Sequence, residues 1–188
     1  MTDPLRLPPD LSVPPDDGAC RHLPGLRMPA LALPGTGGGT VDLGRATPAW
    51  TVLYCFPRAS QPGDPPPPDW DRIPGARGCT AQACDFRDHH QPLIALGAVV
   101  FGIGTQTPAA LQEIATRLLL PFELLSDDGF QLTEALRLPT FTAGGPRLLR
   151  RQTLVVRHGV IETVFYPIFP PDRSTVQLIE WLASRQTG

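Results

Sequence analysis

Two cysteines, Cys79 and Cys84, stand five positions apart in the segment GCTAQACDFRD, which covers residues 78–88. The segment follows a turn and opens a run with helical spacing of apolar residues, so we expect Cys79 at a helix N-terminus. A helix N-terminus and a nearby cation such as Arg77 both favour the thiolate, which is the nucleophilic form of cysteine. The spacing therefore predicts a reactive thiol with a second thiol close enough to attack it afterwards.

The helix itself separates the two thiols. Residues five apart in a regular helix have Cα atoms about 8.6 Å apart, whereas a disulfide needs less than about 7 Å. If Cys79 and Cys84 bond, the first turns of the helix must unwind, which predicts a reduced helical state and an oxidised, locally unfolded one. Ionisation alone increases the thiolate population only about 30-fold. Catalysis therefore also requires donors that polarise the substrate, including a second cation from elsewhere in the chain.

Composition limits the class of protein. The chain has 188 residues, 41% of them hydrophobic, and a formal net charge of -2, which gives no reason to expect nucleic acid or an anionic membrane as partner. No apolar run approaches the roughly 18 residues that span a bilayer. Residues 1–15 lack the basic start and apolar stretch of a secretory signal. We therefore expect a cytoplasmic protein, in which a close cysteine pair is more often catalytic or metal-binding than a permanent cross-link.

The prolines are concentrated in two stretches of the chain. Of the 24 prolines, seven fall in residues 1–30 and seven in residues 57–78. Proline fixes φ and removes a backbone donor, so neither stretch is expected to form ordinary helix or central strand. We predict an N-terminal extension over residues 1–30, one domain over residues 31–188, and an inserted proline-rich loop over residues 64–78 within that domain.

The remaining segments predict an α/β fold. Strands are expected at 50–56, 98–103 and 121–125, with a terminal hairpin of 151–156 and 160–166 around His158-Gly159. Helices are expected at 80–96, 108–117, 130–137 and 174–184, the first with Ala83, Phe86, His90, Leu93 and Ile94 on one face. Strands that alternate with helices and end in a hairpin and a helix give a single α/β domain in the order of a thioredoxin-like fold.

Several segments together carry a resemblance to a known family. Besides the cysteine segment, they are Tyr54-Cys55-Phe56-Pro57, Phe101-Gly102-Ile103-Gly104-Thr105, residues 121–127 (PFELLSD), Arg151 to Val156 and Ile161 to Phe165. In this combination the chain resembles the Q-type peroxiredoxins, or bacterioferritin comigratory proteins, of the alkyl hydroperoxide reductase/thiol-specific antioxidant superfamily. The resemblance extends over about residues 27–185.

The resemblance implies roles for three residues. Cys79 would be the peroxidatic cysteine, which attacks hydrogen peroxide or an alkyl hydroperoxide and becomes a sulfenic acid, and Cys84 the resolving cysteine, which forms an intramolecular disulfide with it. Arg151 matches the distant catalytic arginine of the family. A thioredoxin-type reductant would restore the thiols, and no metal or organic cofactor takes part. Because resolution needs no second subunit, we expect a monomer or a weak homodimer.

The chain departs from the family pattern beside the cysteine. The family usually places Thr or Ser three residues before the peroxidatic cysteine, where this chain has Ala76. The insertion at 64–78 separates Cys79 from the strand end and Pro57. Ser60 and Thr80 are the candidates to supply the missing hydroxyl, and the insertion is expected to shape the pocket or the surface where the reductant docks.

Other interpretations of the same residues stay open. Cys79, Cys84, His89 and His90 could bind zinc, although their spacing does not match the usual ligand motifs. Cys55 is expected in the core and Cys20 as an unpaired surface thiol. Two other functions are a thioredoxin-like disulfide oxidoreductase, which would favour Cys-x-x-Cys, and a non-enzymatic binding protein on the same fold.

Overall fold

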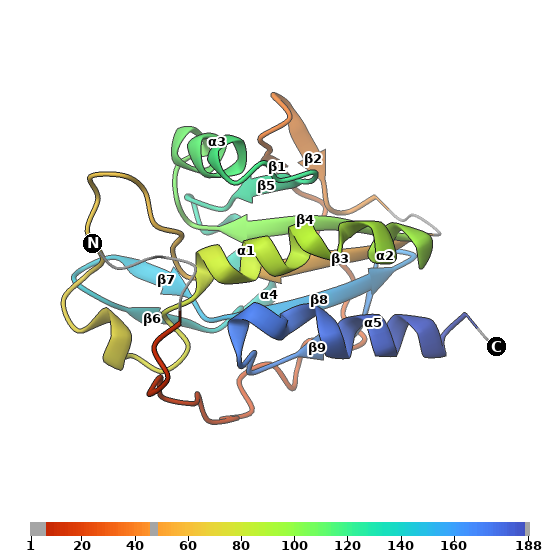
Figure 1. Cartoon of the computed structure of the whole chain (residues 1–188). Coiled ribbons are helices and arrows are strands. Elements are labelled where there is room, and N and C mark those ends of the chain that lie inside the picture. Colours follow the sequence, from red (N-terminus) through yellow and green to blue (C-terminus); the bar gives the residue numbers. More distant parts are fainter. Residues whose placement is uncertain (1–6, 46–48, 187–188) are drawn as a thin grey trace.

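A five-stranded sheet lies at the centre of the molecule (Figure 1). The structure, a computed structural model, describes residues 7–45 and 49–186. The sheet has the order β5-β4-β3-β8-β9. Its strands are β3 (Trp50–Cys55), β4 (Ala98–Gly104), β5 (Glu123–Ser126), β8 (Gln152–Arg157) and β9 (Val160–Phe165). β3, β4 and β5 are parallel, whereas β8 and β9 run antiparallel to their neighbours. The strands correspond to the predicted ones with ends shifted by one or two residues.

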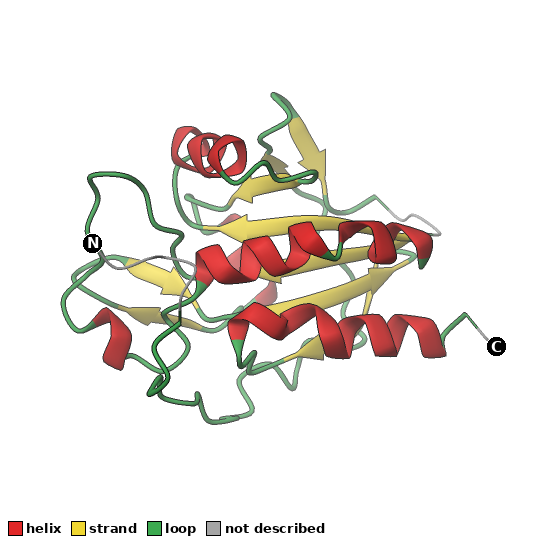
Figure 2. Cartoon of the chain, viewed as in Figure 1, coloured by secondary structure: helices red, strands yellow, loops and turns green. Residues whose placement is uncertain are grey.

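Helices cover both faces of the sheet (Figure 2). The helices are α1 (Cys79–Asp88), α2 (His90–Ala95), α3 (Pro108–Arg117), α4 (Gln131–Leu136) and α5 (Ser174–Ser184). One apolar cluster joins α1, α2, α3 and α5 to the sheet, and a second joins α4 and the N-terminal segment to the opposite face. This arrangement confirms the predicted α/β fold of the thioredoxin-like kind.

The predicted helix over 80–96 is divided into two. α1 ends at Asp88 and α2 begins at His90, while His89 between them has φ -104° and ψ 13°. Pro92 accounts for the break, because its ring would clash with the carbonyl four residues earlier and it has no N–H to donate there. As a result Ile94, predicted on the buried face, is 48% exposed.

Four short strands were not predicted. β1 (Ala32–Pro34) pairs with β2 (Thr40–Asp42), and β6 (Thr140–Thr142) pairs with β7 (Arg147–Leu149). Each has three residues, too few to show a clear alternation of apolar and polar side chains. The β6-β7 hairpin matters for the site because the inserted loop packs against it.

Part of the N-terminal segment, from Cys20 onward, contributes side chains to the core. Leu23 is fully buried, and the backbone N–H of Gly25 donates to the carbonyl of Ile161 at 2.8 Å. Cys20 is 5% exposed, so the expectation of a surface thiol is wrong, and burial raises the pKa of Cys20 to about 12. This burial was not predicted because prolines argue against helix and strand, but a segment without helix or strand can still be buried. Cys55 is fully buried, as predicted.

The inserted loop forms a small apolar cluster of its own. Its short 3₁₀ helix (Trp70–Arg72) buries Trp70 against Ala76, Ala143 and Leu148. The Trp70 ring lies 6.3 Å from the ring of Phe141 on β6. In Figure 1 the loop, in yellow, lies beside the β6-β7 hairpin. The loop is thereby fastened to the domain immediately before α1 begins. No helix in the described part of the chain is both long and apolar enough to cross a membrane.

Candidate active site

The first residue of α1 is Cys79, and its side chain is 4% exposed. Gly78 precedes it with φ 103°, a conformation that favours glycine, and a Cβ at this position would lie 2.3 Å from Cγ of Pro171. The sulfur of Cys79 accepts a hydrogen bond from the backbone N–H of Arg58 at 3.4 Å, and lies 3.6 Å from the carbonyl oxygen of Ala76, to which a thiol can donate. The turn therefore fixes the sulfur at the N-terminal end of the helix.

Arg151 is the cation beside this sulfur. It is 3% exposed, and its Nη2 donates to Sγ of Cys79 at 3.2 Å. The same nitrogen lies 3.1–3.3 Å from the carbonyl oxygens of residues 75–77, and Nη1 donates to Oε1 of Gln82. Among the described residues, no ion pair includes Arg151. The guanidinium is therefore buried among neutral acceptors, in a position to stabilise negative charge that develops at the sulfur during a reaction.

A second loop faces the sulfur and is held on both sides. The side-chain amide of Gln106 accepts from the N–H of Ala59 at 2.8 Å and donates to the carbonyl of Ala59 at 3.1 Å. Arg117 on α3 donates to the carbonyl of Ser60 at 2.6 Å. The loop at residues 58–60 is therefore held by two side chains that are distant in sequence, one from the connection between β4 and α3 and one from α3 itself.

A small cavity of about 120 Å³ opens above Cys79. The loop at residues 58–60, the inserted loop through Asp64, Pro66 and Trp70, and the start of α1 line it. Arg58 forms an ion pair with Asp64, which ties the inserted loop to the strand-end loop. The insertion thus closes one side of the cavity, as the sequence suggested. The volume suits a small substrate.

Cys84 lies on the same helix but faces the core. It is 7% exposed and belongs to the apolar cluster that includes Tyr54 and Phe86, whose rings stack at 4.2 Å. Burial raises the pKa of Cys84, and the charge of Arg87 opposes that rise. All four cysteines are free, and α1 is continuous from Cys79 to Asp88. This is the reduced helical state expected from the sequence.

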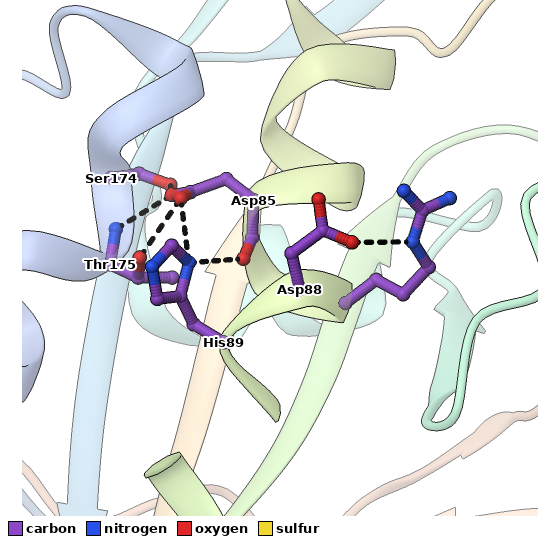
Figure 3. Close-up of polar contacts among 6 residues, drawn as sticks. Asp85, Asp88, His89, Ser174 and Thr175 are labelled. Atoms are coloured by element: carbon purple, nitrogen blue, oxygen red, sulfur yellow. Dashed lines mark hydrogen bonds and ion pairs between the residues drawn. The ribbon is translucent and has the colours of Figure 1, made fainter. Parts of the chain in front are cut away.

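Asp85, the next residue, joins α1 to α5 (Figure 3). Its carboxylate accepts from the N–H of Thr175 at 2.8 Å, from the hydroxyl of Thr175 at 3.0 Å and from the hydroxyl of Ser174 at 3.1 Å. Nδ1 of His89 lies 3.1 Å from the same carboxylate. Arg173, the residue before α5, makes no side-chain cap. Asp85, a residue of α1, therefore caps the N-terminus of α5. This role usually belongs to the residue that directly precedes the capped helix.

Replacing Asp85 by asparagine is expected to lower the free energy of unfolding by about 1–3 kcal/mol, because the amide puts a donor where the carboxylate accepts from Ser174 and Thr175. Urea denaturation measures the change. Asp88→Asn is the matched control, since Asp88 points away from α5 in Figure 3 and its side chain is 61% exposed. Its effect should stay within about 0.5 kcal/mol. Equal effects of the two variants would contradict the capping role.

The structure brings two of the three predicted site residues into direct contact. Cys79 and Arg151 are neighbours, whereas Cys84 lies farther along the helix that begins at Cys79, with its side chain in the apolar cluster. His89 contacts Asp85, and no cluster of three or more potential metal-ligand side chains occurs among the described residues. Gln82, which was not predicted as a site residue, is fully buried three residues after Cys79. The sequence signal that could have indicated it is a polar residue three positions after Cys79, which lies on the same side of the helix as the cysteine.

Comparison with known proteins shows which family the chain resembles. A model described as the AhpC/TSA family matches residues 73–164. Peroxiredoxin Bcp of Bacillus subtilis (strain 168) is 34% identical over 111 residues, which are 59% of this chain and 61% of that protein. Chloroplastic peroxiredoxin Q of Triticum aestivum is 31% identical over 156 residues, which are 81% of this chain and 64% of the relative. The chain is therefore similar to the AhpC/TSA family over residues 73–164. The relatives that it matches are named as peroxiredoxins of the Q and Bcp kind.

Solved structures of peroxiredoxins share the fold. BcpB from Mycobacterium tuberculosis superposes with a TM-score of 0.69 at 21% identity, over 87% of this chain and 98% of that one. A cysteine-to-serine variant of PrxQ from Xylella fastidiosa gives a TM-score of 0.71 at 17% identity, over 88% of this chain and 98% of that one. The predicted fold class is thereby confirmed.

Proposed function

We propose that this protein reduces hydrogen peroxide or an alkyl hydroperoxide at Cys79, with Arg151 as the cation of the reaction. The contact of 3.2 Å between Nη2 of Arg151 and the sulfur carries the proposal. The thiolate attacks the distal oxygen of the peroxide, the S–O bond forms, and the O–O bond breaks. The sulfur is oxidised by two electrons to a sulfenic acid, and the peroxide leaves as water or an alcohol after taking up a proton. The guanidinium stabilises the negative charge that passes from sulfur to the leaving oxygen.

Cys84 is proposed to resolve the sulfenic acid. Its thiolate attacks the oxidised sulfur and displaces hydroxide, which leaves as water, so that an intramolecular disulfide forms. The continuous helix keeps the two Cα atoms about 8.6 Å apart, so α1 must unwind locally first. Unwinding also exposes Cys84 to water, which removes the burial that raises its pKa. Local unfolding therefore both shortens the distance and activates the second thiol.

A thioredoxin-type reductant is proposed to complete the cycle by thiol–disulfide exchange with the Cys79–Cys84 disulfide. The proposed cycle needs one chain only, in keeping with a monomer or a weak homodimer. A cytoplasmic location stays a prediction, and the plant relatives are named as chloroplastic.

A stoichiometric titration tests the proposal. One equivalent of hydrogen peroxide should remove two titratable thiols from the reduced protein, and only one from Cys84→Ser, which should accumulate a sulfenic acid that reacts with dimedone. Cys20→Ala, which changes a buried thiol on the opposite sheet face, should still lose two. Loss of two thiols from Cys84→Ser would show that another cysteine resolves the reaction.

A further inference from the structure

The cavity above Cys79 contains a pair of hydroxyl groups that the reaction described so far does not use. Oγ of Ser60 lies 3.2 Å from Oγ1 of Thr80, and both residues line the cavity together with Cys79. The pair joins segments on the two sides of the inserted loop. Thr80 is 4% exposed, whereas Ser60 is exposed to solvent. The two hydroxyls therefore form a short chain from water to the residue next to the reactive sulfur.

We propose that Ser60 and Thr80 together bind the peroxide and deliver a proton to its leaving oxygen, an inference that rests on the proposed function. Each hydroxyl has one hydrogen to donate. When Ser60 donates to Thr80, the hydrogen of Thr80 is free to donate to the peroxide. The leaving oxygen then takes the proton of Thr80, Thr80 takes that of Ser60, and Ser60 recovers one from solvent. The sulfur loses two electrons to the peroxide, and one solvent proton balances the step.

Three contacts hold Ser60 in this position. Arg117 donates to its carbonyl at 2.6 Å, and Gln106 bonds both the N–H and the carbonyl of the preceding residue, Ala59. The N–H of Arg58 in the same loop donates to the sulfur of Cys79. A serine whose only role is to keep the surface polar would not need these contacts to its loop. These contacts fix the backbone of residues 58–60 relative to the reacting atom, and the hydroxyl of Ser60 is then placed by its contact with Thr80, as catalysis by orientation requires.

The position three residues before Cys79 offers no alternative hydroxyl. Ala76 is fully buried, and its side chain belongs to the apolar cluster of Trp70, Ala143 and Leu148. Its contribution to the site is a backbone carbonyl, which accepts from Nη2 of Arg151 at 3.1 Å. Ala76 therefore presents no side chain to the cavity, whereas Ser60 and Thr80 line it.

The test separates peroxide binding from thiol reactivity. In a Cys84→Ser background, stopped-flow oxidation by hydrogen peroxide is compared with alkylation of Cys79 by iodoacetamide, which needs the thiolate but no proton donor. We expect Thr80→Val to slow oxidation about 100-fold and Ser60→Ala about 10-fold, with alkylation unchanged in both. Ser60→Thr, which keeps the hydroxyl, should restore the parent oxidation rate. Thr116→Val, at an exposed hydroxyl on α3, is the control and should oxidise like the parent.

Three results would overturn the inference. Ser60→Ala and Thr80→Val could oxidise at the parent rate, or both could lose oxidation and alkylation equally, which would indicate a structural role only. Because Ser60 is on the surface, its alanine variant keeps the test valid even if Thr80→Val does not fold. A parent protein that reacts with iodoacetamide but never with peroxide would instead overturn the proposed function, and the inference with it.

Discussion

Cys79→Ser is expected to lose peroxide reduction by about 1,000-fold or more, because a serine hydroxyl is not ionised near neutral pH and is a poor nucleophile toward oxygen. Peroxide consumption in the presence of excess dithiothreitol measures the loss. The substitution exchanges only sulfur for oxygen at a 4% exposed position, so the thermal unfolding transition should move little. Cys55→Ala, with its thiol on the other face of the sheet, serves as the control and should keep its activity. Undiminished turnover in Cys79→Ser would assign the chemistry to another residue.

Arg151→Met is expected to slow oxidation of Cys79 by about 100- to 1,000-fold, because it removes the buried charge that stabilises both the thiolate and the leaving oxygen. Alkylation by iodoacetamide should slow as well, unlike in the hydroxyl variants. Stopped-flow measurements of both reactions give the two rates.

The neighbouring residue provides the control for Arg151. Arg150 is half-buried and is not among the residues that contact the sulfur, so Arg150→Met should react at the normal rate. Arg151→Lys should be intermediate, since lysine keeps the charge but cannot reach several acceptors at once as a planar guanidinium does. Because Arg151→Met also leaves carbonyls of residues 75–77 without a donor, its folding must be checked by circular dichroism. A folded Arg151→Met protein with normal oxidation would contradict the role of the arginine.

Much of the fold could be predicted because local signals agreed with the final structure. The apolar run at 50–56, the proline at the start of α3 and the glycine after α2 each mark an element that the structure contains. The error at 80–96 arose where two signals competed. Helical spacing continued through His90 and Leu93, but Pro92 interrupts the backbone, and only the proline argument gives the observed break at His89.

The site could be predicted in part. The resemblance indicated Cys79, Cys84 and Arg151, and the spacing of the cysteines gave the need for local unfolding. The contacts that support them depend on residues distant in the chain, such as Gln106 with Ala59 and Asp85 with Thr175. No local pattern reports such pairs. Burial of Cys20 was missed for the same reason, since its contact with Gln152 spans 132 positions.

Peptide mapping after oxidation tests the central claim most directly. The reduced protein is treated with one equivalent of hydrogen peroxide, its remaining thiols are alkylated, and a non-reducing digest is analysed by mass spectrometry. Both cysteines lie in the tryptic peptide of residues 78–87. We predict that this peptide carries no alkyl group and is lighter by two hydrogens than its reduced form, because Cys79 and Cys84 are linked within it, with Cys20 and Cys55 alkylated once the protein is denatured. A linkage through Cys20 or Cys55, or complete alkylation of Cys79 and Cys84 after the peroxide has been consumed, would contradict the proposed cycle.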